Sequence, residues 1–319
     1  MRSTLLITGA NGFVGRVLCE EAIAQDFDVR GATRSTCHSD SGTENVIVGT
    51  VDGATDWTAA LNGVDTVIHL AARVHVMRDT TADPLAEFLK TNLHGTTNLA
   101  SQAARAGIKR FVYASSIKVN GEETPAGRNY SEQDMPAPQD PYGISKWEAE
   151  QALWRVAQET GLEVVIVRPP LVYGAGVRGN FAQMMRIVVR GIPLPLASVR
   201  NQRDLVYVGN LVDALITCAT HPAAAGQTYL ISDGESVSTP ELLRRLAAAL
   251  DVPSRVFPFP PALLKLAGKL TGKSAQVERL LGSLRVDSEK IRRGLDWRPP
   301  YSIQQGLQVT ADWYRAKAS

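Results

Sequence analysis

Cysteine, net charge and long apolar runs are all scarce in this sequence. The three cysteines, Cys19, Cys37 and Cys218, are scattered. They provide neither a disulfide framework nor a metal-ligand spacing, so we expect a reducing, cytoplasmic location and no metal site. With 34 basic and 32 acidic residues the net charge is only +2, which is too small for nucleic acid to be the main partner. No apolar run reaches the roughly 20 residues that cross a bilayer, so no stable membrane span is expected.

The composition is that of a soluble globular protein. Hydrophobic residues make up 44% and charged residues 21% of the 319 positions, which are ordinary values for such proteins. The length exceeds that of one simple core and fits one large domain or two interlocked domains.

Three glycines near the N-terminus have the context of a dinucleotide-binding loop. The short apolar run Leu5–Ile7 is typical of a buried parallel strand. The loop Thr8–Gly15 follows with the spacing G-x-x-G-x-x-G, and a helical pattern comes next. Gly9 would form the tight turn, Gly12 would let the backbone approach a pyrophosphate, and Gly15 would let the helix pack on the strand. A flexible turn is the simpler alternative, but the order of strand, loop and helix favours cofactor binding.

The end of the second strand bears on the choice of nicotinamide cofactor. Residues 28–33 are typical of a strand that ends at Arg34, with no Asp or Glu at that point. NAD-selective sites hold the ribose 2′-hydroxyl with an acidic residue here, whereas an arginine accommodates the 2′-phosphate of NADPH. We therefore expect NADPH, with NAD as the alternative if Arg34 is only a solvated loop residue.

The remaining pattern predicts an α/β fold of the Rossmann type, that is, a doubly wound parallel sheet with a smaller C-terminal α/β substrate lobe. Apolar runs alternate with helical patterns, as is typical of such a sheet. The expected strands are 5–7, 28–33, 45–51, 64–72, 110–114 and 163–167, and the long helices are 84–106 and 142–160. His69, near the end of the fourth strand, is expected to be a packed residue rather than a catalyst.

A change in composition after residue 170 suggests a second lobe. Prolines become frequent there and the elements shorten. We assign 1–170 to the NAD(P)-binding domain, with segments near 205–218 and 227–232 returning to it, and 171–319 mainly to the substrate lobe. Two helical patterns in that lobe, near 262–273 and 276–284, have apolar faces that we expect to pack within it rather than on a membrane.

The functional prediction centres on a short segment around Tyr142. Tyr142 and Lys146 are four residues apart, so on a helix they lie on one face. Asp140 followed by Pro141 is a typical helix start. An ammonium group beside a phenol favours the phenolate, so Lys146 would lower the pKa of Tyr142 from about 10 towards neutrality. The pair alone is more often an ordinary surface pair, so this prediction depends on the other motifs.

Together with several ordered motifs, these residues resemble the extended short-chain dehydrogenases/reductases of the NAD-dependent epimerase/dehydratase type, which modify nucleotide sugars. The resemblance covers essentially the whole chain. The motifs that carry it are Thr8–Gly15, His69–Ala72, Asn92, Ser116, Tyr142 with Lys146, Arg168-Pro169, Asn180, Arg203–Val208 and Leu295–Pro299.

The resemblance implies a role for each matched position. Tyr142 would be the catalytic acid/base, Lys146 its partner and a ribose ligand, Ser116 the hydroxyl on the reacting sugar oxygen, and Asn92 the support of a proton-relay water. The expected cofactor contacts are Gly9, Asn11, Gly12, Phe13, Val14, Gly15, Arg34, Leu70, Ala71, Ala72, Tyr142, Lys146 and Arg168. The expected substrate contacts are Ser116, Asn180, Arg203 and Arg279, with Arg285 as an alternative to Arg279.

The resemblance leaves two enzymatic functions open. In the 4,6-dehydratases of this family an Asp–Glu pair follows the catalytic hydroxyl, whereas Ile117 and Lys118 follow Ser116 here. Dehydration therefore lacks its acid/base pair. Arg34 favours a reductase that exchanges NADPH and reduces the C4 ketone of a UDP-4-keto-6-deoxy-(N-acetyl)hexosamine. The alternative is a UDP-hexose 4-epimerase, similar to UDP-glucose 4-epimerase, that retains NAD.

Three further segments favour the reductase. Arg73–Met77, Ser115–Glu122 and Gly179–Phe181 look like the enzymes that reduce such UDP-sugars in bacterial surface-polysaccharide synthesis. A non-catalytic dinucleotide-binding protein is a third alternative, but relatives of that kind commonly lose the Tyr–Lys pair, which this chain keeps. Members of the family often pack two helices per subunit into a four-helix bundle, so a homodimer through the two long helices is expected.

Overall fold

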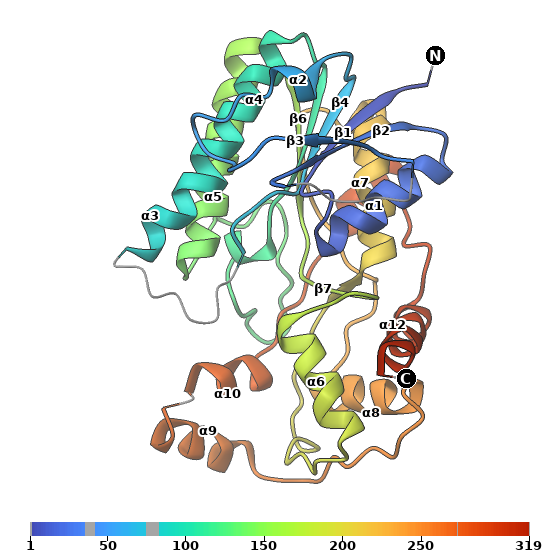
Figure 1. The fold of residues 1–319 in the computed structure, drawn as a ribbon. Coiled ribbons are helices and arrows are strands. Elements are labelled where there is room, and N and C mark those ends of the chain that lie inside the picture. The colour runs from blue at the N-terminus through green and yellow to red at the C-terminus, as the bar shows by residue number, and fades with distance from the viewer. Residues whose placement is uncertain (1, 36–41, 75–82, 273, 319) are drawn as a thin grey trace.

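Seven parallel strands form the main sheet of the protein (Figure 1). The computed structural model describes residues 2–35, 42–74, 83–272 and 274–318, so the expectations for Cys37, Val76 and Met77 fall outside the described residues. The strands are β1 (Thr4–Thr8), β2 (Asp28–Thr33), β3 (Glu44–Ile47), β4 (Thr66–His69), β5 (Arg110–Ala114), β6 (Glu163–Arg168) and β9 (Gln227–Leu230). Their order is β3-β2-β1-β4-β5-β6-β9, and each neighbouring pair is parallel. The strand order reverses between β1 and β4, so the predicted doubly wound Rossmann sheet is confirmed.

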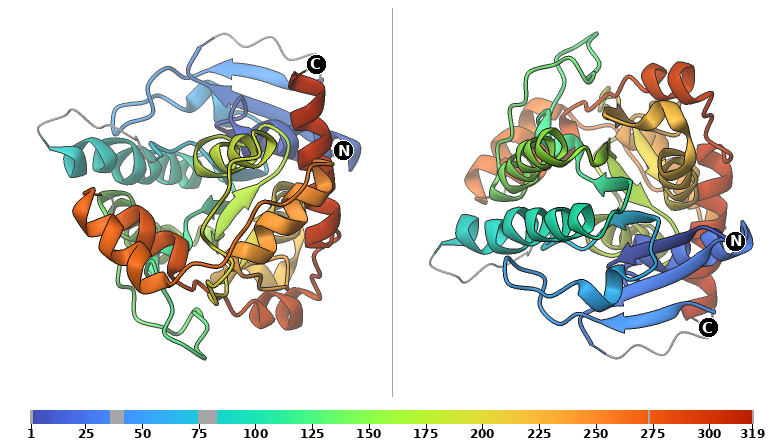
Figure 2. Two further views of the ribbon diagram at one scale, coloured as in Figure 1. Left: turned by 90° about the horizontal axis from the view of Figure 1, so that it is seen from below. Right: turned by 90° about the horizontal axis from the view of Figure 1, so that it is seen from above.

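Helices cover both faces of this sheet (Figures 1 and 2). On one face α1 (Phe13–Ala24) packs against α7 (Val208–Thr220). On the other face lie α3 (Pro84–Leu89), the π-helical turn η1 (Lys90–Gly95), α4 (Thr96–Arg105) and α5 (Pro141–Thr160), while the short α2 (Thr58–Leu61) follows β3. Alternate residues of β1 pack against the two helical layers. Leu5 belongs to the hydrophobic cluster with α1 and α7, and Leu6 belongs to the cluster with α4 and α5.

The two long predicted helices are both present, and residues at the ends of α5 explain where that helix begins and ends. The Asp140 side chain accepts a hydrogen bond from the Gly143 N–H (2.7 Å), with Pro141 as the first residue of α5. Gly161, at φ +77°, ends that helix, so the predicted start and length of α5 are confirmed. The helix predicted over 84–106 is also present, but a π-helical turn interrupts it around Asn92. The strand predicted over 45–51 is shorter in the structure, where β3 spans only Glu44–Ile47.

The second lobe is built around a small parallel pair of strands. These are β7 (Leu171–Tyr173) and β8 (Leu205–Tyr207). The other elements of this part of the chain are α6 (Gly179–Val189), η3 (Pro222–Ala224), α8 (Thr239–Ala249), α9 (Pro261–Leu270), α10 (Ser274–Leu281), α11 (Glu289–Leu295) and α12 (Ile303–Ala318). Of the segment 205–218, β8 pairs with β7, whereas α7 contacts the main sheet. The division of the chain near residue 170 stays a prediction.

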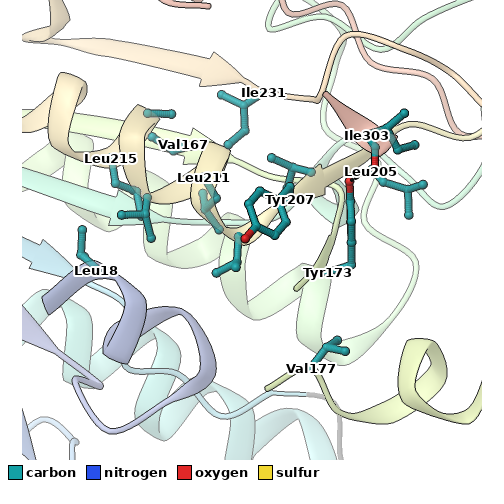
Figure 3. Packing of buried hydrophobic residues seen from close by; sticks show 14 of the residues in the cluster. Leu18, Val167, Tyr173, Val177, Leu205, Tyr207, Leu211, Leu215, Ile231 and Ile303 are labelled. Carbon is teal, nitrogen blue, oxygen red and sulfur yellow. Dashed lines mark hydrogen bonds between the residues drawn. The ribbon is translucent and has the colours of Figure 1, made fainter. Parts of the chain in front are cut away.

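A continuous core joins the two lobes through α7. Figure 3 shows Leu211 and Leu215 of α7 in one cluster with Leu18 of α1 and Val167 of β6. The indole Nε1 of Trp297 donates to Asp213 of the same helix (2.6 Å). The C-terminal motif Leu295–Pro299 therefore attaches to α7 through the Trp297 side chain.

A buried carboxylate fixes the small strand pair. Asp233 accepts hydrogen bonds from the Tyr173 hydroxyl (2.8 Å), the Tyr207 N–H (2.8 Å) and the Asn210 amide (2.7 Å). These contacts tie β7, β8 and α7 together, because a buried carboxylate is stable only where several donors surround it. Within the described part of the chain, no helix is both long and apolar enough to cross a bilayer.

Candidate active site

The glycine loop lies where the strand order reverses. Gly9 follows β1 with φ at +69°, and its N–H donates to the Ala32 carbonyl of β2 (3.1 Å). A Cβ on Gly9 would lie 3.1 Å from the Ala71 nitrogen, and a Cβ on Gly15 would lie 2.1 Å from the Gly9 carbonyl oxygen. Gly9 is thus required by its backbone conformation, and Gly15 because α1 packs directly on the loop.

This loop fits the pyrophosphate of a dinucleotide. Asn11 and Gly12 are exposed, and among the described residues no side chain caps the N-terminus of α1. The N–H groups of the first helical turn are therefore available, and a helix N-terminus favours phosphate. Five further expected cofactor contacts are half-buried at the same edge of the sheet: Phe13, Val14, Leu70, Ala71 and Ala72.

A buried hydrogen-bond network fixes the ends of β1 and β4. Thr8 Oγ1 accepts from the backbone N–H groups of Leu70 (3.1 Å) and Ala71 (3.0 Å). Its own proton therefore goes to His69 Nδ1 (2.7 Å), and His69 Nε2 donates to Thr96 Oγ1 (2.9 Å). Burial lowers the pKa of His69 to about 3, and Lys146 adds to this, so the ring is neutral. His69 is packed, as predicted, but its partners Thr8 and Thr96 could not be predicted from the sequence.

The two arginines of β2 lie in different environments. Arg30 donates to the Glu44 carboxylate (2.9 Å) and to the carbonyls of Ala60 (3.2 Å) and Asn62 (2.5 Å). Its guanidinium thus joins β2 to β3 and α2. Arg34 is exposed just beyond the strand end, where a 2′-phosphate would lie in this type of fold. Arg34 is therefore the arginine that can meet a cofactor.

Three of the four expected catalytic side chains come together at the carboxyl end of β5. Ser116 follows that strand and begins the 3-10 turn η2 (Ile117–Val119). The Ser116 side chain hydrogen-bonds Tyr142, which lowers the pKa of the phenol. Lys146 is buried, and its Nζ donates to the Ala114 carbonyl (2.7 Å) and lies 5.9 Å from the Tyr142 ring centroid. The arrangement has the parts of an acid/base site: a phenol, an amine and a hydroxyl.

Burial reverses the expected pKa of Tyr142. Desolvation raises the pKa of the phenol to about 12, and the Asp140 carboxylate adds to the rise. Desolvation also lowers the pKa of Lys146 to about 7, with Glu150 acting in the opposite direction. The expectation that Lys146 brings the pKa of Tyr142 towards neutrality is therefore wrong, because desolvation dominates the pKa of the phenol and outweighs the Ser116 hydrogen bond. Tyr142 is a neutral phenol with a proton to donate.

Asn92, in the π-helical turn η1, stabilises the site through side-chain hydrogen bonds to two other segments. Its Oδ1 accepts from the Arg73 N–H (2.8 Å), and its Nδ2 donates to the Arg73 carbonyl (3.0 Å) and to Ser145 Oγ (2.9 Å). The side chain thus connects the segment after β4 to α5, one residue before Lys146. Asn92 is a positioning residue here, and π-turns are often found at functional sites.

A second buried network holds α5 against β6. Glu150 and Arg168 form a bidentate ion pair, in which Arg168 Nε donates to Glu150 Oε1 (3.0 Å) and Arg168 Nη2 donates to Glu150 Oε2 (2.5 Å). Arg168 Nη1 also donates to Asn120 Oδ1 (3.0 Å), and Ser115 Oγ donates to Glu150. Only 4% of Arg168 is exposed, and its guanidinium binds Glu150 and Asn120, so its expected contact with the cofactor stays a prediction. The role of Glu150 could not be predicted from the sequence, because its partners Ser115 and Arg168 are distant in the chain.

The expected substrate residues other than Ser116 lie in the part of the chain after residue 170. Arg203 Nη1 donates to the carbonyls of Arg279 (2.9 Å) and Gly282 (3.0 Å), so it holds the end of α10. Arg279 is exposed, and its Nε lies 3.6 Å from the Glu122 carboxylate in the loop after β5. The two arginines are thus neighbours on the side of the catalytic loop.

The other two candidates differ in exposure. Asn180 is exposed at the start of α6, and Arg285 is half-buried. Lys118, two residues after Ser116, binds Glu122 (3.0 Å) and also the Asp140 carboxylate. Lys118 therefore offsets the negative charge at the start of the catalytic helix, a role that the sequence did not predict.

Known proteins resemble this chain over its whole length. The model of the family described as the NAD dependent epimerase/dehydratase family matches residues 5–232. A Vibrio cholerae protein named UDP-glucose 4-epimerase is 46% identical over 98% of this chain and 95% of its own length. An Escherichia coli O157:H7 protein named N-acetyl-alpha-D-glucosaminyl-diphospho-ditrans,octacis-undecaprenol 4-epimerase is 29% identical over 98% of this chain and 96% of its own. The Thermus thermophilus UDP-glucose 4-epimerase, solved in complex with NAD, is 25% identical with a TM-score of 0.79, covering 98% of this chain and 99% of that one.

Proposed function

The chain belongs to the NAD-dependent epimerase/dehydratase family, and we propose that it is an enzyme that exchanges hydride between NAD(P) and C4 of a UDP-sugar. The observation that carries this proposal is the 46% identity, over 98% of the chain, to a protein named UDP-glucose 4-epimerase. The proposal is supported by the close approach of Ser116, Tyr142 and Lys146 at the end of β5. The same relatives argue against a non-catalytic dinucleotide-binding protein.

The chain's own groups supply positioning and proton transfer. NAD(P), when bound in the glycine loop, gives or takes a hydride at C4. Tyr142 holds its proton at neutral pH, so it can donate to the C4 oxygen as a ketone becomes an alcohol, and take the proton back in the reverse direction. Ser116 orients that oxygen, and Lys146 lies where it can hold the ribose beside the phenol. Asn92 keeps α5 in place for these steps.

Charge on the second lobe suits a sugar diphosphate. The names of both sequence relatives describe sugars joined to a diphosphate. Arg203 and Arg279 are neighbours on that lobe, and guanidinium groups bind phosphate well. We assign the diphosphate to these two arginines and a sugar or ribose hydroxyl to Asn180.

UDP-hexose 4-epimerisation is the first candidate reaction, because the Vibrio cholerae and Thermus thermophilus relatives are both named UDP-glucose 4-epimerase. An epimerase removes the C4 hydride and returns it to the opposite face, so it needs no added cofactor once NAD is bound. Reduction of a UDP-4-keto-6-deoxy-(N-acetyl)hexosamine is the second candidate. Arg34 favours it, since this exposed arginine at the end of β2 suits an exchanging NADPH. We also propose a homodimer through α4 and α5, as in the bundles of related enzymes.

One pair of assays separates the candidates. Purified protein is incubated with UDP-glucose without added cofactor, and in parallel with UDP-4-keto-6-deoxy-GlcNAc and NADPH, and the products are resolved by NMR. UDP-galactose in the first reaction supports the epimerase, and a reduced 4-hydroxy sugar in the second supports the reductase. If neither substrate is converted by a protein that binds NAD(P), C4 chemistry on UDP-sugars is rejected.

The position of Arg34 leads to a separate prediction about the preference for NADPH over NADH. Replacing it with alanine should weaken NADPH binding about tenfold or more, because a charge-assisted hydrogen bond to the 2′-phosphate is lost. NADH binding should change little, since NADH has no such phosphate. Fluorescence titration of both cofactors measures the ratio. Arg105→Ala, at the exposed end of α4, is the matched control, and an unchanged ratio in Arg34→Ala would show that Arg34 is a solvated loop residue.

A further inference from the structure

The helix α9 lies at an outer corner of the second lobe. In Figures 1 and 2 it lies at the edge of the molecule, with α10 beside it and the chain from α8 leading to it. Its contacts with other helices and strands are chiefly with α10. Gly268 is buried and Leu264 packs on the core, so one face of α9 holds it to the lobe and the opposite face is open.

The open face of α9 is apolar. Leu263, Leu266 and Leu270 follow the spacing i, i+3, i+7, which places them on one stripe of the helix. Their exposed fractions are 48%, 53% and 80%. Phe257, before α9, and Leu280, on α10, are also exposed large apolar residues. Single exposed leucines are ordinary, but a continuous stripe marks an interaction surface.

The charge around this stripe has one sign. Lys265 and Lys269 are exposed on α9, and Arg255 is exposed in the chain before it. Between Asp251 and Glu278 the sequence has no acidic residue. A short helix with leucines on one face and lysines beside them has the composition of a helix that lies in the interface of an anionic membrane.

We propose that α9 docks this protein on an anionic lipid surface, with the three leucines in the acyl boundary and the lysines among the headgroups. A second copy of the chain fits less well, because a two-fold contact through α9 would bring the lysines of both copies together. Docking goes beyond the proposed reaction and does not depend on it. It has a consequence for the site, because α10 packs on α9 and carries Arg279. The lipid surface would thus adjoin the second lobe beside the residues assigned to the diphosphate.

Vesicle flotation with the full chain tests the docking. Wild-type protein is mixed with vesicles of phosphatidylcholine containing about 30 mol% phosphatidylglycerol, or of phosphatidylcholine alone, and centrifuged through a density gradient. We expect the protein to float with the anionic vesicles and to bind the neutral ones about tenfold less. Binding should fall again at about 0.5 M salt, because lysine attraction to the headgroups is screened. Protein that stays at the bottom with anionic vesicles overturns the proposal.

Variants assign the binding to α9. Leu266→Glu/Leu270→Glu should lose flotation, while Met135→Glu, at an exposed apolar residue outside this lobe corner (87% exposed), should float like wild type. Lys265→Glu/Lys269→Glu should reduce binding about tenfold or more, while Lys109→Glu should not. Circular dichroism melts verify folding. Unchanged flotation of both α9 variants rejects α9 as the docking element, and a wild-type dimer that becomes monomeric in Leu266→Glu/Leu270→Glu shows that a second copy covers the stripe instead. None of these readouts needs catalytic activity.

Discussion

Tyr142→Phe should lower kcat about 10³-fold, within the range that a positioned general acid contributes. The phenol is the group at this site that keeps its proton at neutral pH, since burial raises its pKa to about 12. Phenylalanine keeps the ring, which packs edge-on against Phe88 with centroids 6.1 Å apart, so α5 should remain in place. The measurement is the initial rate with whichever UDP-sugar the wild-type enzyme converts.

Two controls separate a lost proton donor from a damaged site. NAD(P) affinity of Tyr142→Phe should stay within about twofold of wild type, because one hydroxyl among many cofactor contacts is removed. Tyr314→Phe, on α12 and outside the proposed site, should leave both rate and affinity unchanged. Turnover in Tyr142→Phe at the wild-type rate would remove Tyr142 from the mechanism.

Arg168→Met should lower the free energy of unfolding by about 3–5 kcal/mol, because it leaves the Glu150 carboxylate buried without its cation. Glu150 is fully buried and accepts from both Nε and Nη2 of Arg168. Asn120 also loses the donor to its Oδ1. Urea unfolding followed by circular dichroism measures the change, and it should be larger than that of most single substitutions in this chain.

A surface pair provides the matched comparison. Arg293 and Glu289 lie four residues apart on α11 with Nε–Oε2 at 3.2 Å, and the Arg293 side chain is 82% exposed. Arg293→Met should cost less than about 1 kcal/mol. The double variant Glu150→Leu/Arg168→Met should be more stable than Arg168→Met alone, since no buried charge is left unpaired. A cost below about 1 kcal/mol for Arg168→Met would show that Glu150 is solvated or protonated instead.

Local patterns predicted the elements that carry the site. The loop Thr8–Gly15 and the start of α5 at Asp140 depend on residues close in the chain, namely glycines that permit one backbone conformation and a capping carboxylate three residues from its donor. Such signals are complete within a short window of sequence. The doubly wound parallel sheet also followed, because strands that alternate with helices admit few connections.

The interruption of the helix over 84–106 was not predicted. Its sequence has no proline after Pro84, and a single glycine such as Gly95 is tolerated in a helix at a cost of about 1 kcal/mol, so the pattern indicates one continuous helix. The π-helical turn places Asn92 where it binds the Arg73 backbone and Ser145. These partners are 19 and 53 residues away, and tertiary contacts of that kind override local propensity.

The sequence alone determined the cofactor loop and the parallel sheet, because short-range geometry and residue chemistry decide these features, and its motifs together predicted Ser116, Tyr142 and Lys146 as the acid/base groups. Tertiary structure alone decided how those groups behave. The protonation of Tyr142, the neutral state of His69 and the pairing of Arg168 with Glu150 each depend on water exclusion and on partners brought together by folding. Desolvation is a property of the packed neighbourhood and not of the residue, so no spacing in the chain could have revealed it.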